Sequence, residues 1–89
     1  MAWTIEYAAS VQKSIRKLDV QTRQRIRNYL EERIAALDDP REQGAPLLGT
    51  LGGLWRYRVG DYRIICEIHD DRLRVLVLSV GHRREVYRS

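Results

Sequence analysis

Three arginines in a short stretch of the chain have a spacing that would let them bind a phosphate group together. Arg56 and Arg58 lie in WRYRV (55–59), and Arg63 follows in DYRI (61–64) after a short turn. Because side chains alternate between the faces of a strand, Arg56 and Arg58 share one face, to which a hairpin can add Arg63. Each guanidinium stays charged and forms a planar fork that fits phosphate oxygens. Alternating arginines are often simply solvated, but this pattern favours a polyanionic ligand.

The segment GHRREVY (81–87) holds a second set of chemically capable side chains. Histidine both accepts and donates protons near neutral pH, so His82 is the first candidate for acid–base chemistry. Arg83 adds a further cation, and Tyr87 could stack against a base. Singly, these residues also have structural explanations, since a histidine can cap a strand and a tyrosine can anchor a tail. Together with the arginines, they suit a bent phosphodiester and a stacked base.

No other familiar catalytic pattern stands out. The sequence has no glycine-rich phosphate loop, no Ser/His/Asp pattern and no paired carboxylates. Cys66 is the only cysteine and falls on the opposite strand face from His69, so we expect no metal site and no cofactor. Because Cys66 lies in an apolar run, we predict a buried free thiol in a reducing compartment.

Composition and charge indicate one globular domain, residues 1–89, that binds a polyanion. The chain is 44% hydrophobic and 31% charged, as in ordinary globular proteins. No apolar stretch approaches the roughly 20 residues that cross a membrane, and the N-terminus lacks the features of a signal peptide, so we expect a cytoplasmic protein. The net charge is +4, and residues 54–89 carry 8 basic and 5 acidic groups, a net of +3.

Hydrophobic periodicity predicts a strand followed by two helices. Residues 2–7 alternate with a period of two, and helical spacing begins at Ala8. Asp19 is a natural N-cap for a second helix, which should stop before Pro40. Its apolar stripe should run through Ile26, Leu30, Ile34 and Leu37. The short break between the helices predicts an antiparallel helical hairpin. Residues 39–53 are rich in glycine and proline and should form a loop held to the body by its leucines, Leu47, Leu48 and Leu51.

Three further segments have the character of strands: Leu54–Val59, Tyr62–His69 and 73–80. Short turns join them, so they should form an antiparallel meander. The third is almost continuously apolar and should be flanked by other strands. We therefore predict an α+β fold of order β-α-α-β-β-β, with the helical hairpin packed on one face of a mainly antiparallel sheet. The three arginines would lie on the helix-free face of a small basic domain that binds RNA.

Two motifs, GLWRYRVGDYRIICEI (53–68) and VLVLSVGHRREVY (75–87), resemble the RelE branch of the RelE/ParE superfamily of toxins from type II toxin–antitoxin systems. The resemblance extends over essentially the whole chain. It implies a RelE-like fold and a ribosome-dependent endoribonuclease, an mRNA interferase whose cleavage of mRNA inhibits translation and arrests growth. It also implies a cognate antitoxin that holds the toxin inactive, with the ribosome and mRNA as the other partners.

The resemblance also implies residue roles. The catalytic candidates are Arg56, Arg63, His82, Arg83 and Tyr87, and the RNA-binding candidates are Arg56, Arg58, Arg63, Arg83 and Tyr87. In the expected reaction the 2′-OH of one nucleotide attacks the adjacent phosphorus, so the substrate supplies its own nucleophile. The protein then has to supply geometry and to stabilise negative charge. His82 is preferred for proton transfer on chemical grounds, because a guanidinium is a poor base at neutral pH.

Three alternatives remain. A ParE-like toxin would share the fold and poison DNA gyrase without nuclease activity, although the GHRREVY ending and the arginine pattern argue against it. A catalytically inactive relative would bind RNA or the antitoxin and cut nothing. A scaffold for a protein partner would not need the charges of Arg56 and Arg58.

Overall fold

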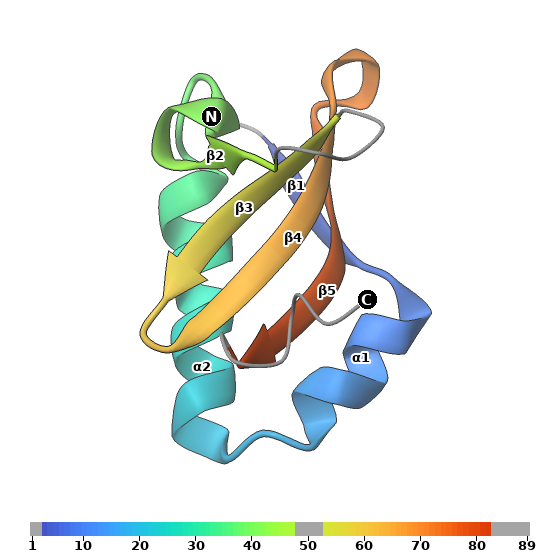
Figure 1. Cartoon of the computed structure of the whole chain (residues 1–89). Coiled ribbons are helices and arrows are strands. Elements are labelled where there is room, and N and C mark those ends of the chain that lie inside the picture. The colour runs from blue at the N-terminus through green and yellow to red at the C-terminus, as the bar shows by residue number, and fades with distance from the viewer. Residues whose placement is uncertain (1–2, 48–52, 83–89) are drawn as a thin grey trace.

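The strands lie where apolar residues alternate with a period of two, and the helices lie where apolar residues recur at helical spacing. The computed structural model describes residues 3–47 and 53–82. The strands are β1 (Thr4–Tyr7), β2 (Ala45–Pro46), β3 (Leu54–Val59), β4 (Tyr62–His69) and β5 (Arg74–His82), and the helices are α1 (Ala9–Arg16) and α2 (Val20–Asn28). Both helices pack on one face of the sheet, as Figure 1 shows. The predicted α+β class and the order of the main elements are confirmed.

The helical hairpin depends on a buried stripe and on one capping residue. Val11 and Ile15, four residues apart on α1, are both buried. At the start of α2, Asp19 accepts hydrogen bonds from the Thr22 backbone N–H at 3.2 Å and from the Thr22 hydroxyl at 2.6 Å. The first of these satisfies a backbone donor that the opening turn of a helix leaves without a partner. The predicted N-cap at Asp19 is confirmed.

The second helix departs from the prediction beyond its middle. The α-helix ends at Asn28 and continues as a π-helical segment, Tyr29–Ile34. Its buried residues Ile26, Leu30 and Ile34 have no exposed surface and recur every four residues. An α-helix has 3.6 residues per turn, so a stripe of this spacing drifts around it, whereas a wider turn keeps the stripe facing the sheet. The helix stops before Pro40, as predicted, but it ends at Ile34, before Leu37, the last residue of the predicted apolar stripe.

The sheet has the strand order β1-β5-β4-β3-β2. β1 pairs with β5 in parallel, and all the other neighbours are antiparallel. The bounds of β3 and β4 are those predicted, and β5 is flanked by two strands as expected. β5 runs from Arg74 to His82 rather than over 73–80, because Leu73 adopts a left-handed backbone (φ 48°) that ends the preceding turn.

The predicted loop 39–53 contains regular structure in its described part. Pro40–Gln43 forms a short 3-10 helix, and Ala45–Pro46 pairs with β3 as an edge strand. Proline is tolerated at an edge because it removes no hydrogen bond from an interior ladder. The backbone N–H of Leu47 donates a hydrogen bond to the carbonyl oxygen of Leu54, the first residue of β3, at 3.0 Å. Leu48 and Leu51, the other leucines expected to hold the loop, lie outside the described residues.

The core lies between the helix pair and the sheet. Ile64 and Cys66 of β4 and Val75 and Val77 of β5 have no exposed surface. Cys66 is a buried free thiol, as predicted, and burial raises the pKa of this thiol to about 12. In the part of the chain that the structure describes, the helices are too short and too polar to cross a bilayer.

Candidate functional site

The hairpin of β3 and β4 brings Arg56, Arg58 and Arg63 to the face of the sheet that the helices leave uncovered. Arg58 lies directly opposite Arg63 in the ladder, and Arg56 lies opposite Ile65. The residues between the two β3 arginines and after them point the other way and are buried in the core. Arg58 is exposed, whereas Arg56 and Arg63 are half-buried. We call these three residues the arginine face.

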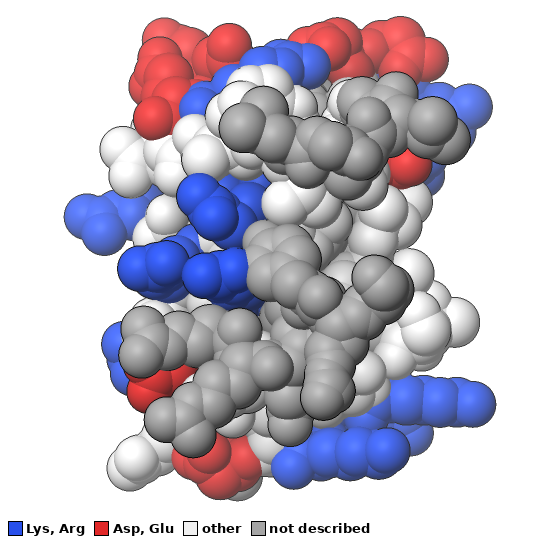
Figure 2. Space-filling view, viewed as in Figure 1, with Lys and Arg blue, Asp and Glu red and all other residues white. Residues whose placement is uncertain are grey.

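The charge of Arg56 and Arg58 is not neutralised by ion pairs in residues 3–47 and 53–82. Arg27, Arg41 and Arg74 each contact a carboxylate, but Arg56 and Arg58 do not. Figure 2 shows one group of lysine and arginine side chains at mid-height on the left of this face and another at its lower right edge, with acidic side chains mostly at the top and bottom. Concentrated positive charge of this kind attracts a polyanion and is screened by salt.

The structure does not bring His82 to the arginine face. His82 pairs with Tyr62, and the two rings meet edge to face with centroids 5.6 Å apart. Tyr62 packs against the core, on the helix side of the sheet. Its neighbour Arg63 pairs with Gly81 on the opposite face.

A bulge explains this placement. The β4–β5 register shifts between Ile65 and Cys66, so that Ile65 pairs with Ser79 and Cys66 pairs with Val77. β5 therefore contains one extra residue at this point. An extra residue in one strand moves every later side chain of that strand to the other face. Without the bulge, His82 would share the face of the arginines.

Arg83 and Tyr87, the remaining candidate residues, lie outside the described residues. Their roles in binding the phosphate and stacking on a base stay predictions. The structure brings together three of the six candidates, Arg56, Arg58 and Arg63, and separates a fourth, His82, from them.

A hydrogen-bonded chain that the sequence did not reveal crosses the same face further along. His69 Nε2 is 2.9 Å from Glu67 Oε1, and Arg74 Nε donates to His69 Nδ1 at 3.0 Å. Arg74 also donates to Glu6 Oε1 at 2.9 Å. The only signal for it in the sequence is the alternation along β4, which puts Glu67 and His69 on the same face as Arg63. Glu6 and Arg74 are 68 positions apart and meet only because β1 pairs with β5.

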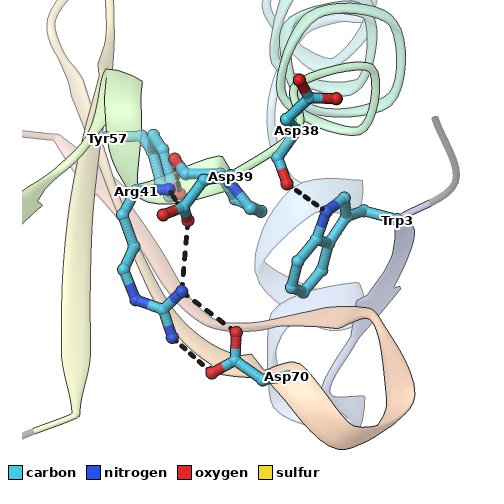
Figure 3. Close-up of polar contacts among 7 residues, drawn as sticks. Trp3, Asp38, Asp39, Arg41, Tyr57 and Asp70 are labelled. Atoms are coloured by element: carbon cyan, nitrogen blue, oxygen red, sulfur yellow. Dashed lines mark hydrogen bonds and ion pairs between the residues drawn. The ribbon is translucent and has the colours of Figure 1, made fainter.

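Arg41 fastens the end of the sheet opposite the β3–β4 turn. Its guanidinium donates two hydrogen bonds to Asp70, at 3.1 and 2.6 Å, and one to Asp39 at 3.1 Å. Figure 3 shows it lying between these two carboxylates. Nearby, the buried Tyr57 hydroxyl donates to the Pro40 carbonyl at 2.7 Å. The cluster joins the 3-10 helix before β2 to β3 and to the β4–β5 turn, so it holds the strands that carry the arginine face.

Among residues 3–47 and 53–82, no three His, Cys, Asp or Glu side chains lie close enough together to hold a metal ion.

In sequence, this chain is similar to a toxin family and to individual toxins. A family model described as the ParE toxin of the type II toxin–antitoxin system parDE matches residues 5–87. Toxin RelG of Mycobacterium tuberculosis is 26% identical over 88 residues, which are 99% of this chain and 99% of that protein. Toxin RelE of the same species is 38% identical over 52 residues, covering 58% of this chain and 54% of that protein.

Solved structures share the fold of this chain. A chain of the RelBE2 toxin–antitoxin complex from Mycobacterium tuberculosis superimposes with a TM-score of 0.83 at 24% identity, over 93% of this chain and 100% of that chain. A chain of the archaeal RelE–RelB complex from Pyrococcus horikoshii superimposes with a TM-score of 0.76 at 23% identity, over 97% of this chain and 100% of that chain.

Proposed function

Because this chain belongs to the RelE/ParE superfamily of toxins from type II toxin–antitoxin systems, we propose that it is a ribosome-dependent endoribonuclease that cleaves mRNA. The cut inhibits translation and arrests growth, which places the protein in the cytoplasm with the ribosome. The attacking group is the 2′-OH of the RNA itself, so the reaction requires no metal and no cofactor to generate a nucleophile.

The observation that carries this proposal is the arginine face. Three guanidinium groups come from adjacent strands, with Arg58 and Arg63 directly opposite one another. Like charges at opposing positions of a ladder repel one another, so the pair is favoured where an anion binds. A bound phosphate would be stabilised by both groups, because guanidinium–phosphate hydrogen bonds are charge-assisted.

In the proposed reaction a bond forms between the 2′-oxygen and phosphorus, and the bond from phosphorus to the 5′-oxygen of the next nucleotide breaks. The 2′-OH loses a proton and the departing 5′-oxygen gains one, which leaves a 2′,3′-cyclic phosphate and a free 5′-OH. Negative charge grows on the phosphate oxygens in the transition state. Arg56 and Arg63, with Arg83, hold that phosphate, Arg58 binds the RNA beside it, and Tyr87 stacks on a base to keep the backbone bent.

The sequence favours His82 for proton transfer, but in β5 its side chain lies on the other face of the sheet. The imidazole packs on Tyr62, on the far side of the sheet from Arg56, Arg58 and Arg63. We therefore propose that the toxin supplies charge stabilisation and substrate geometry, and that the ribosome completes the site.

A cognate antitoxin is the second proposed partner. The comparison structures include toxin–antitoxin complexes, among them RelBE2 of Mycobacterium tuberculosis and RelE–RelB of Pyrococcus horikoshii. A positively charged face is blocked well by an acidic segment that folds on binding, because the complementary charges speed association and set specificity.

The decisive experiment maps 5′-OH ends of mRNA in translating cells after controlled expression. Wild-type protein should produce new ends at a fixed position within codons. Arg63→Ala and Arg83→Ala should produce few or none, and Arg23→Ala, an arginine on α2, should behave as wild type. The proposal fails if wild-type protein produces no new ends.

A ParE-like gyrase poison is the second candidate, because the matching family model is that of ParE toxins. Growth arrest without new mRNA ends would favour this candidate, provided that Arg63→Ala and Arg83→Ala arrest growth as wild type does. Neither arrest nor new ends would identify a catalytically inactive relative.

A further inference from the structure

A row of three side chains crosses the helix-free face next to the arginine face. Glu67 of β4 lies directly opposite Leu54 of β3 on one side and opposite Leu76 of β5 on the other. All three are half-buried, so part of each side chain is accessible from outside. The row therefore offers one carboxylate between two aliphatic side chains.

The carboxylate of Glu67 is held in a defined orientation. Arg74 Nε can only donate, so its 3.0 Å contact requires His69 Nδ1 to be the acceptor. The proton of the neutral imidazole must then sit on Nε2, which donates to Glu67 Oε1 at 2.9 Å. Arg74 is fixed in turn by Glu6 at 2.9 Å.

The other oxygen of this carboxylate remains available. Glu67 Oε2 makes no hydrogen bond or ion pair within residues 3–47 and 53–82. The side chain is 42% exposed, so a ligand can reach part of it from outside. An ionised carboxylate has only acceptor sites, and this one is preorganised by three other side chains.

The row lies within one nucleotide of the arginine face. Arg56 pairs with Ile65, so Glu67 is its diagonal neighbour across the β3–β4 ladder, about 7–8 Å away. The phosphate and the base edge of one nucleotide are separated by a comparable distance. A nucleotide with its phosphate on Arg56 would place its base against Leu54 and Leu76 and its edge at Glu67.

We propose that Glu67 selects the base of the RNA nucleotide bound at Arg56, accepting bases that carry an amino group and rejecting uracil. The inference rests on the proposed ribonuclease function. Cytosine, adenine and guanine each offer an N–H₂ donor to the free oxygen of Glu67. Uracil presents two carbonyl oxygens around a single N–H, and these repel a carboxylate. The flanking leucines supply an apolar surface for whichever base is accepted.

The test compares Glu67→Gln with Glu32→Gln, a matched change of charge at an exposed position of the π-helical segment. Glutamine keeps the acceptor for His69, so the fold is preserved, but it also offers an N–H₂ donor to uracil. In mapped mRNA ends, wild type and Glu32→Gln should avoid uridine at one position near the cut. Glu67→Gln should raise cutting at uridine about tenfold, the size of one base-edge hydrogen bond. An unchanged base distribution in Glu67→Gln would overturn the proposal.

A binding measurement tests base selection independently of cleavage. In fluorescence anisotropy with short labelled oligocytidine and oligouridine, wild type should prefer oligocytidine and Glu67→Gln should not. Equal binding of the two oligonucleotides by wild type refutes selection by Glu67. Absence of cleavage together with a clear binding preference would overturn the proposed nuclease and leave base selection standing.

Discussion

Arg58 and Arg63 stand directly opposite each other on β3 and β4, so two guanidinium groups share one rung of the ladder on the uncovered face of the sheet. Like charges at opposing positions weaken a sheet. Arg58 is exposed and has no carboxylate partner among the described residues, so its own charge is not neutralised there. The arrangement is expected where a bound anion, rather than the fold, determines the residue type.

Replacing Arg58 by glutamine should therefore stabilise the free protein while weakening its function. The repulsion across the rung is removed, so the free energy of unfolding should rise by about 0.2–1 kcal/mol. Urea denaturation measures this, and growth arrest on expression should be reduced in the same variant. Arg23→Gln, which removes a charge from α2, should change neither quantity appreciably. A destabilised Arg58→Gln would mean that the guanidinium has a structural role.

Arg56→Gln should lower the salt dependence of RNA binding. Each phosphate neutralised on single-stranded RNA contributes about 0.7 to the slope of log K against log salt concentration. Loss of one contact should lower the slope by about that amount, weakening binding to all sequences. Titrations of a short oligonucleotide between low and physiological salt measure the slope, with Arg72→Gln as the control. An unchanged slope would exclude Arg56 from phosphate contact.

The β3–β4 hairpin could be predicted to the residue because its register is fixed locally. Gly60 supplies the positive φ of 59° that the tight turn requires, and alternation on both sides of the turn agrees with it. A slip by one residue would bury Arg58 and expose Tyr57, so no other register is tolerated. The arginine face followed from sequence for this reason.

The face of His82 could not be predicted, because it depends on a bulge that no local pattern marks. Strict alternation along β5 from the buried Val75 and Val77 would put His82 on the same face as the arginines. The extra residue in β5 puts it on the opposite face. The link between Glu6 and Arg74 was also hidden, since it requires the parallel pairing of the first and last strands. Both features come from tertiary packing rather than from local sequence.

Tyr57→Phe should destabilise the protein without altering RNA contacts. The variant removes the buried hydrogen bond to the Pro40 carbonyl and leaves that acceptor without its partner. The free energy of unfolding should fall by about 0.5–1.5 kcal/mol. Tyr29→Phe is the matched control, because the Tyr29 hydroxyl makes no hydrogen bond within the described residues. Equal losses in both variants would show that the Pro40 contact is not the cause.

Stability should depend on pH in the acid range through Asp70. The hydrogen bonds from Arg41 hold the pKa of this carboxyl below its ordinary value of 3.8 in the folded protein. A carboxyl whose pKa is lower in the folded protein than in the unfolded chain stabilises the fold at pH values above its unfolded-state pKa. This stabilisation is lost as the pH falls through its folded-state pKa. The difference in unfolding free energy between wild type and Asp70→Asn should therefore be constant above about pH 5 and shrink below it. In an Arg41→Gln background, the same comparison should lose its pH dependence.

His82→Gln distinguishes an acid–base role from a packing role at the end of β5. Since the imidazole lies against Tyr62 and away from the arginine face, the substitution should leave the rate of ribosome-dependent cleavage within about threefold of wild type, with the same pH profile. Arg63→Ala should lose about 10²–10³ in rate, as expected when a group that stabilises transition-state charge is removed. Single-turnover cleavage rates measured from about pH 5.5 to about pH 8.5, the interval in which an imidazole changes its charge, test both expectations. A comparable loss in His82→Gln, with a flattened pH profile, would restore the role assigned from sequence and require the ring to leave Tyr62 when RNA binds.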